Sequence, residues 1–252
     1  MTLWEDLAVL LAGVAAGTIN TVVGSGTLIT FPVLLAFGVP PVTANVSNTI
    51  GLVPGSLSGA IGYREELKGT APQLLRLGTA SLLGGLLGAW LLIELPGSAF
   101  DAIVPVLILL ALVLVVIQPR VARAMAARTR DGEPRGIGPV LLTGVFLAGV
   151  YGGYFGAAQG VLLIALLGML LQDPMQKLNG IKNVLAMVVN GVAAVFFVFT
   201  SEIDWLVVAL IAVGSTIGGQ VGAKVGRRLS PVALRCLIVA VGLVAVTRML
   251  LT

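Results

Sequence analysis

Residues 81–89 read SLLGGLLGA, and residues 215–223 read STIGGQVGA. The two stretches share the pattern Ser-x-x-Gly-Gly-x-x-Gly-Ala at a shift of 134 positions, and the same shift places Pro40 on Pro174. Glycines four apart let two helix backbones approach closely, so both stretches are predicted to pack helices together. A duplication of this kind in an apolar chain is typical of membrane transporters that bind their substrate between two related halves.

The composition of the chain points to the membrane. Of its 252 residues, 58% are hydrophobic and only 10% are charged, and the mean hydropathy is +1.07. A soluble domain carries roughly 25% charged residues. We therefore expect an integral membrane protein. The net charge of +4 is explained by basic residues in cytoplasmic loops, and we expect no nucleic-acid partner.

The residue types that are missing exclude several kinds of chemistry. The chain has no histidine, and Cys236 is its only cysteine. This excludes an intramolecular disulfide, a thiolate or histidine metal site and Ser-His catalysis. We expect no metal, no cofactor and no catalytic residue. No Asp or Glu lies in the middle of a predicted span, so the usual carboxylate for proton coupling is missing. Transport could be coupled to sodium, to a proton or through a lysine, or it could be uncoupled.

Apolar runs divide each half into five predicted segments. A bilayer core requires about 20 apolar residues per helix. The second run of each half has thirteen residues, so it is expected to be a short or broken helix. The first run follows Trp4, Glu5 and Asp6, unlike the basic start of a signal peptide, and is expected to be retained. The predicted segments are 7–24, 26–38, 43–62, 72–93 and 98–118, then 139–158, 160–172, 178–199, 204–226 and 231–251.

Charges between these segments alternate in sign. Basic residues cluster within 64–76, 118–138, 173–182 and 224–235, and those loops are predicted to be cytoplasmic. The other connections are acidic, and only Arg248 lies on the unexpected side. The pattern predicts both termini outside, and an odd number of crossings per half inverts the second half relative to the first. The acidic positions are Glu5, Asp6, Glu94, Asp101, Glu202 and Asp204.

We predict an all-α, polytopic transmembrane helical bundle with two inverted-topology repeats and about 8–10 membrane segments. The first repeat covers 1–118 and the second covers 138–252. Residues 119–137 form a basic linker bounded by Pro119 and Pro134. This linker is interpreted as a connector that carries topology charges, the alternative being a regulatory or lipid-binding arm.

Polar residues inside the predicted spans gather around the short segments, in corresponding parts of both halves. Burying a polar group in a membrane is costly, so each of these residues is expected to have a structural or functional role. Gly24, Ser25 and Gly26 can interrupt a helix and expose backbone N–H groups beside Thr27. Those groups and a helix N-terminus would suit an anion. The alternative is a tight turn between two helices.

Two asparagine pairs and one lysine complete this set of polar residues. Asn45 and Asn48 share a helix face, and so do Asn179 and Asn183. They suit sulfonate or carboxylate oxygens or a sodium ion, or else they hydrogen-bond helices together. Lys182 falls on Asn48 at the shift of 134. It would attract an anion if it lies near the midplane, or it would snorkel to the cytoplasmic interface.

The order of these features resembles the sulfite exporter TauE/SafE family. The resemblance rests on Gly13-x-x-x-Gly17, on GSGTLITFP at 24–32, on GVPPVTAN at 38–45 and on the stretch at 81–89. The chain departs from the family at Ser25, where members often have three glycines in a row. Its second half is also degenerate, reading AAQG at 157–160. The resemblance implies a multi-pass bacterial inner-membrane permease that moves sulfite, sulfonates or related small organic anions.

We therefore expect a secondary transporter for a small anion, working by alternating access between the halves, and not an enzyme. The expected partners are the anion, the lipid bilayer and a coupling ion, and a homo-oligomer remains open. The alternatives are a non-transporting membrane scaffold or subunit and, third, an intramembrane enzyme. The predicted substrate-binding residues are Asn20, Ser25, Thr27, Asn45 and Asn48 from the first half and Gln159, Asn179, Lys182 and Asn183 from the second.

Overall fold

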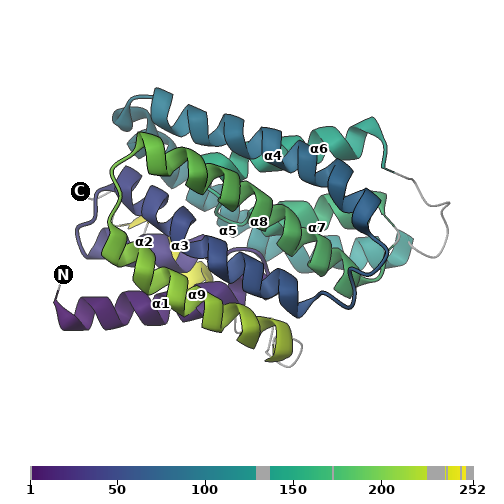
Figure 1. The fold of residues 1–252 in the computed structure, drawn as a ribbon, viewed down its shortest axis with the longest axis horizontal. Coiled ribbons are helices and arrows are strands. Elements are labelled where there is room, and N and C mark those ends of the chain that lie inside the picture. The colour runs from purple at the N-terminus through teal and green to yellow at the C-terminus, as the bar shows by residue number, and fades with distance from the viewer. Residues whose placement is uncertain are drawn as a thin grey trace.

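The protein is helical throughout the part of the chain that its computed structural model describes, which is residues 2–128, 137–171, 173–225, 236, 238–244 and 246–247. No strand occurs among these residues, so the predicted all-α class is confirmed. Figure 1 shows the helices running along the long axis of the molecule. They are α1 (Leu3–Val22), α2 (Thr27–Ala36), α3 (Pro41–Gly62), α4 (Ala71–Glu94), α5 (Gly97–Arg128), α6 (Pro139–Tyr154), α7 (Gln159–Leu170), α8 (Met175–Thr200) and α9 (Trp205–Val225).

Five of these helices are long and apolar enough to cross a membrane by length and composition: α1, α4, α8, α9 and the Gly97–Arg120 part of α5. The helices α2, α6 and α7 are shorter, with 10, 16 and 12 residues. At 1.5 Å per residue a helix of 12 residues covers about 18 Å, less than the roughly 30 Å hydrocarbon core. The prediction of a short second helix in each half is confirmed.

Most predicted boundaries agree with the structure to within a few residues. The exceptions are informative. The helix α5 continues to Arg128, so the helix extends into the predicted linker 119–137. The helix α6 ends at Tyr154 because Phe155 leaves the helical conformation, whereas the segment was predicted to reach 158. Most of the last predicted segment, 231–251, lies outside the described residues.

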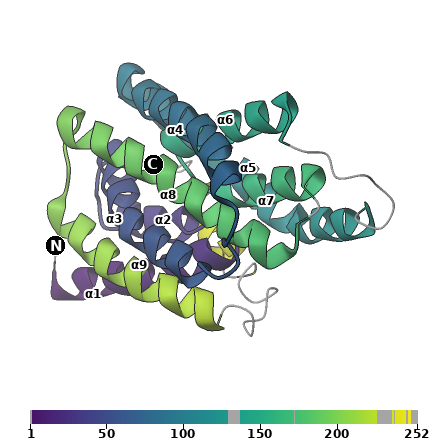
Figure 2. The same ribbon diagram turned by 45° about the vertical axis from the view of Figure 1, so that its right-hand side comes forward.

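The two helices that carry the repeated stretches each pack against the other half of the chain. The helix α4 lies against α6 and α8, and α9 lies against α1 and α3. Figures 1 and 2 both show α4 beside α6 and α9 beside α1. The halves therefore exchange corresponding helices, and neither half of the sequence makes a separate packing unit by itself.

Glycines bring these exchanged helices into backbone contact. A Cβ added to Gly84 would overlap the carbonyl oxygen of Phe146 on α6, and one added to Gly218 would overlap that of Val14 on α1. A Cβ on Gly149 would lie 2.9 Å from the Ser81 carbonyl oxygen. Only glycine permits so close an approach. The predicted packing role of the repeated stretches is confirmed.

The contacts of α6 and α1 correct the repeat register in one region. Gly149 meets Ser81 as Gly17 meets Ser215, so Gly17 and Gly149 correspond at a shift of 132. The ends of α1 and α6, at Val22 and Tyr154, follow the same shift, whereas the repeated stretches keep 134. The extra two residues lie in α7, which is two residues longer than α2.

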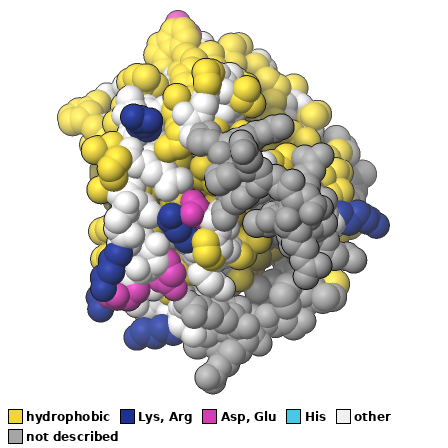
Figure 3. Space-filling view, turned by 90° about the vertical axis from the view of Figure 1, so that its right-hand side faces the viewer, with side chains coloured by type: hydrophobic (Ala, Val, Ile, Leu, Met, Phe, Trp, Pro, Cys, Tyr) yellow, Lys and Arg dark blue, Asp and Glu magenta, His cyan; other side chains and the backbone are white. Residues whose placement is uncertain are grey.

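The connections between helices gather at two opposite ends of the molecule. In Figure 1 the start of α1, the α4–α5 connection and the α8–α9 connection lie at the left end, and these segments carry acidic residues and no basic ones. The α3–α4 connection and the start of α6 lie at the right end. Figure 3 looks at the right end and shows Lys and Arg side chains with a few Asp and Glu. The two groups of loops are therefore separated as the charge pattern predicts, while their sidedness stays a prediction.

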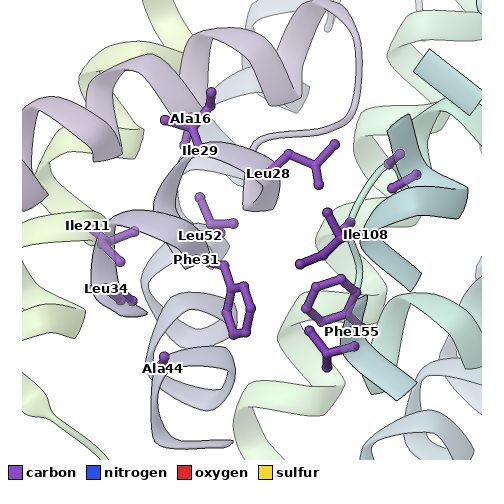
Figure 4. Close-up of a cluster of buried hydrophobic side chains, with 14 of the residues drawn as sticks. Ala16, Leu28, Ile29, Phe31, Leu34, Ala44, Leu52, Ile108, Phe155 and Ile211 are labelled. Atoms are coloured by element: carbon purple, nitrogen blue, oxygen red, sulfur yellow. The ribbon is translucent and has the colours of Figure 1, made fainter. Parts of the chain in front are cut away.

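The core around the short helices is apolar and partly aromatic. Figure 4 shows Phe31 of α2 beside Phe155, with Ile108 of α5 close by. The rings of Phe31 and Phe155 are 5.2 Å apart and edge-to-face, and Phe100 lies 6.4 Å from Phe31. Edge-to-face aromatic pairs stabilise beyond their buried area. This cluster fixes α2 against the segment that follows α6.

Candidate functional site

Two helical hairpins meet in the interior of the protein. The helices α1 and α2 form the first, and α6 and α7 form the second. At their tips the Gly160 N–H donates a hydrogen bond to the Gly24 carbonyl, with an N···O distance of 3.0 Å. A Cβ added to either glycine would overlap the Cα of the other, and Gly24 has a φ of +90°. The meeting of the two halves thus depends on glycine on both sides.

Each hairpin tip presents the N-terminus of a short helix. The N-cap of α2 is Gly26, and the N-cap of α7 is Ala158 with a φ of 60°. No side chain caps either helix. The first N–H groups of a helix carry partial positive charge. In α7 the N–H groups of Gln159 and Gly160 donate to the carbonyls of Gly156 and Gly24, and in α2 the Leu28 N–H donates to the Ser25 carbonyl. These helix ends therefore offer partial charge more than a set of free donors. Two such ends near one point form an environment that suits an anion.

Three predicted site residues have buried polar atoms without a partner among the described residues. They are the Ser25 hydroxyl, the Gln159 amide nitrogen Nε2 and the Asn45 amide oxygen Oδ1. The exposed fractions of these side chains are 1%, 4% and 0%. Buried polar groups are nearly always hydrogen-bonded in proteins. Ser25 and Gln159 flank the Gly24–Gly160 contact, one from each half.

Asn45 also connects the two halves. Its Nδ2 donates to the carbonyl of Tyr154, the last residue of α6, at 2.9 Å. The bond satisfies one of the carbonyl groups that a helix C-terminus leaves without a partner. It also fixes the orientation of the amide, so that the buried Oδ1 is the free acceptor.

Asn48 and Thr27 hold the first hairpin to α3. The Thr30 hydroxyl donates to Asn48 Oδ1 at 2.5 Å, and Asn48 Nδ2 donates to the Thr27 hydroxyl at 3.3 Å. Both sides of the Asn48 amide are therefore used within the bundle. Of the two interpretations of this residue, the structure supports interhelical hydrogen bonding.

Lys182 lies entirely inside the protein. Its side chain has 0% exposure, and its Nζ donates to the carbonyl oxygens of Asn20 and Thr21 at 3.0 and 2.9 Å. These carbonyls belong to the last turn of α1. Lys182 does not snorkel to an interface. Its stem passes the second hairpin tip, since a Cβ on Gly160 would lie 3.0 Å from Lys182 Cδ.

The remaining predicted residues lie farther from the two hairpin tips or are held by other groups. Asn183 Nδ2 donates to the Thr21 carbonyl at 3.5 Å, and Asn179 is only half-buried on the same helix. Asn20 Nδ2 donates to the Ser56 hydroxyl at 3.3 Å. The structure thus brings together Ser25, Thr27, Gln159 and Lys182, with Asn45 and Asn48 on the adjoining face of α3.

One contact between the halves was not predicted. Asn190 of α8 donates to the Ser56 hydroxyl of α3 at 3.3 Å, and the two residues are 134 positions apart. The equal spacing was present in the sequence, but a serine facing an asparagine gives no repeat signal.

The described residues contain no group of three or more His, Cys, Asp or Glu that could hold a metal ion. Lys182 is the one charged side chain among the buried residues that the structure describes. The polar centre is therefore built from hydroxyl, amide and backbone groups with a single lysine amino group.

A family model described as "Sulfite exporter TauE/SafE" matches residues 9–249. The chain belongs to the TauE/SafE family. This confirms the resemblance seen in the sequence, and it identifies the protein as a member of a multi-pass membrane transporter family.

Curated relatives of this TauE/SafE protein match over most of both chains. One is "Probable membrane transporter protein ORF9" of Sinorhizobium sp, 27% identical, covering 95% of this chain and 90% of the relative. Another is "Probable membrane transporter protein YfcA" of Escherichia coli strain K12, 24% identical over 93% and 86%. A third, "Probable membrane transporter protein" of Haemophilus influenzae, is 25% identical over 99% and 96%. All three names describe transporters, and none gives a substrate.

Proposed function

We propose that this protein is a secondary transporter that moves a small anion, sulfite or a sulfonate first among them, through the point where the two hairpin tips meet. One observation carries the proposal: Ser25 and Gln159 present buried, unpartnered polar atoms beside two uncapped helix N-termini. Hydroxyl and amide donors at helix N-termini are the groups that bind anionic oxygens. The name of the family supports the sulfur oxyanions.

The electrostatics of the centre favour negative charge. The C-terminus of α1 carries partial negative charge, which Lys182 neutralises through its bonds to Asn20 and Thr21. The N-termini of α2 and α7 keep their partial positive charge because no side chain caps them. In a low-dielectric interior these fields act over several ångströms with little screening. An anion is therefore the ligand that the centre accommodates with the least desolvation penalty.

The two halves are proposed to be inverted repeats that alternate access to the centre. The contact of Gly24 with Gly160 and the exchange of α4 and α9 support this, because the centre lies between the halves. We propose that the acidic loops and both termini lie outside and that the protein lies in the bacterial inner membrane. We further propose that it acts as a carrier and not as an enzyme or a scaffold.

Counterflow in proteoliposomes tests the proposal. Purified protein is reconstituted into liposomes loaded with unlabelled sulfite or methanesulfonate, and uptake of the labelled anion is measured. We expect uptake above protein-free liposomes, with Ser25→Ala and Gln159→Ala each raising KM or lowering uptake about tenfold, the worth of one or two hydrogen bonds to a charged ligand. Thr79→Ala, on an exposed position of α4, is the matched control and should transport normally.

Uptake of no sulfur oxyanion, sulfonate or carboxylate would contradict the carrier proposal. Normal uptake by both Ser25→Ala and Gln159→Ala would keep a carrier but remove the proposed site.

A further inference from the structure

Helix α1 ends in the interior of the protein, which raises the question of what satisfies its last carbonyl groups. A helix C-terminus has carbonyls without intrahelical partners and partial negative charge. In secondary transporters, the C-terminal ends of interrupted helices often coordinate sodium. The end of α1 lies where such an ion would be expected, beside the hairpin tip at Gly24.

In this protein the Lys182 amino group occupies that position. Lys182 Nζ lies 3.0 Å from the Asn20 carbonyl oxygen and 2.9 Å from that of Thr21, and its side chain has no exposed surface. No carboxylate among the described residues lies within ion-pair distance of it. A buried charge without a carboxylate partner is costly, so the two carbonyls and the helix end provide its compensation.

The corresponding positions of the other half hold neutral groups. At the end of α6 the Tyr154 carbonyl accepts from the Asn45 amide. Asn48, which corresponds to Lys182 at the shift of 134, bonds to the side chains of Thr27 and Thr30 on α2 and not to the carbonyls of a helix C-terminus. An amide side chain therefore binds the C-terminal carbonyl of α6, whereas a lysine side chain binds those of α1.

We propose that the Lys182 amino group fills a small-cation site at the C-terminus of α1, so that a side chain of the protein occupies the place where an exchangeable cation could bind. The wild-type protein then takes up no sodium at this position. Lys182→Ala removes the Lys182 bonds from the Asn20 and Thr21 carbonyls, of which Thr21 keeps the long bond from Asn183 Nδ2, and opens a cavity that a sodium or methylammonium ion can enter. The inference concerns a cation and goes beyond the proposed carriage of an anion.

Thermal stability in detergent tests the inference without any transport substrate. Wild type, Lys182→Ala and Lys182→Met are melted in choline chloride with increasing sodium chloride or methylammonium chloride at constant ionic strength. We expect the wild-type Tm to stay constant. The Tm of Lys182→Ala should be lower in choline and rise saturably, by on the order of 5 °C, with one of the two cations. Lys182→Met fills the space with an apolar chain, so its Tm should not respond.

Three results would overturn the inference: a Lys182→Ala Tm that responds to neither cation, a wild-type Tm that rises as much as that of the variant, or an equal rise for Lys182→Met. If Lys182→Ala does not fold in choline, the yield of monodisperse protein in each salt replaces the Tm. Equal yields would then reject the site, and recovery in sodium or methylammonium would support it. Since chloride is the anion in every condition and no transport substrate is added, these results stand apart from any failure of the carrier proposal.

Discussion

Single glycines decide whether the two hairpin tips can meet. Gly24 and Gly160 contact each other through backbone atoms, and a methyl group on either would overlap the other residue. Overpacking of a well-packed interior typically costs about 1–3 kcal/mol, and an alanine at the positive φ of Gly24 adds strain. Such a substitution would destabilise the contact that joins the halves, where the proposed site lies.

We expect Gly160→Ala to lower the free energy of unfolding by about 2 kcal/mol and to abolish anion counterflow, because the hairpin tips must separate. Thermal melts and counterflow on the same preparation measure the two effects. Gly78→Ala and Gly191→Ala are matched controls, since an added Cβ there meets nothing within 4 Å. If Gly160→Ala behaves as these controls do, the close contact has no role in transport.

At the residue scale, the sequence identified the polar side chains that would be buried in the membrane. It did not show which of them have hydrogen-bond partners. Asn45 and Asn48 lie three positions apart and look equivalent in the sequence. The structure uses both sides of the Asn48 amide and leaves Asn45 Oδ1 without a partner. Partners come from helices far away in the chain, so the sequence spacing alone cannot assign them.

Helices are the scale at which the sequence was most informative. The lengths of the apolar runs and the glycine-rich breaks predicted most helix ends to within a few residues. The end of α5 was missed, since Pro119 lies within the helix that continues to Arg128. Proline disfavours a helix interior but does not forbid it. The exchange of α4 and α9 was not predicted either, because any small-residue face can pack against several partners.

The exchange makes a prediction about fragments. Because α4 packs against α6 and α8, and α9 against α1 and α3, residues 1–128 and 137–252 should assemble when they are expressed as two chains. We expect the two fragments to co-purify in detergent through an affinity tag on either one. Gly84→Leu in the first fragment should weaken this association, because the side chain would collide with the Phe146 backbone. Gly78→Leu, at a position where an added Cβ meets nothing, is the control.

Fragments that purify separately would show that the exchanged contacts are too weak to hold the halves together. Equal co-purification with Gly84→Leu would show that the α4–α6 contact does not determine it.

The whole molecule separates its charged connections into two ends, and this separation leads to a test of sidedness. Single cysteines replace Glu202, Lys68 or Ser201 in a Cys236→Ser background, and a membrane-impermeant maleimide is applied to intact spheroplasts. We expect labelling at positions 202 and 201, which lie between α8 and α9, and none at 68, which lies between α3 and α4, until the membrane is opened. Labelling at position 68 alone in intact spheroplasts would show that the orientation is the reverse of the proposed one. Labelling at position 68 together with positions 201 and 202 would reject the proposed separation of the two ends across the membrane.

The sequence by itself determined that the chain is an all-α membrane protein, that its halves are related, and that each contains a short helix beside a glycine-rich break. These properties follow from hydropathy, helix length and backbone freedom, which act locally along the chain. Only the tertiary structure decided that the hairpin tips meet at Gly24 and Gly160, that α4 and α9 exchange halves, and that Lys182 bonds to the end of α1. These features depend on which distant groups satisfy buried polar atoms, and that choice is made only when the helices pack.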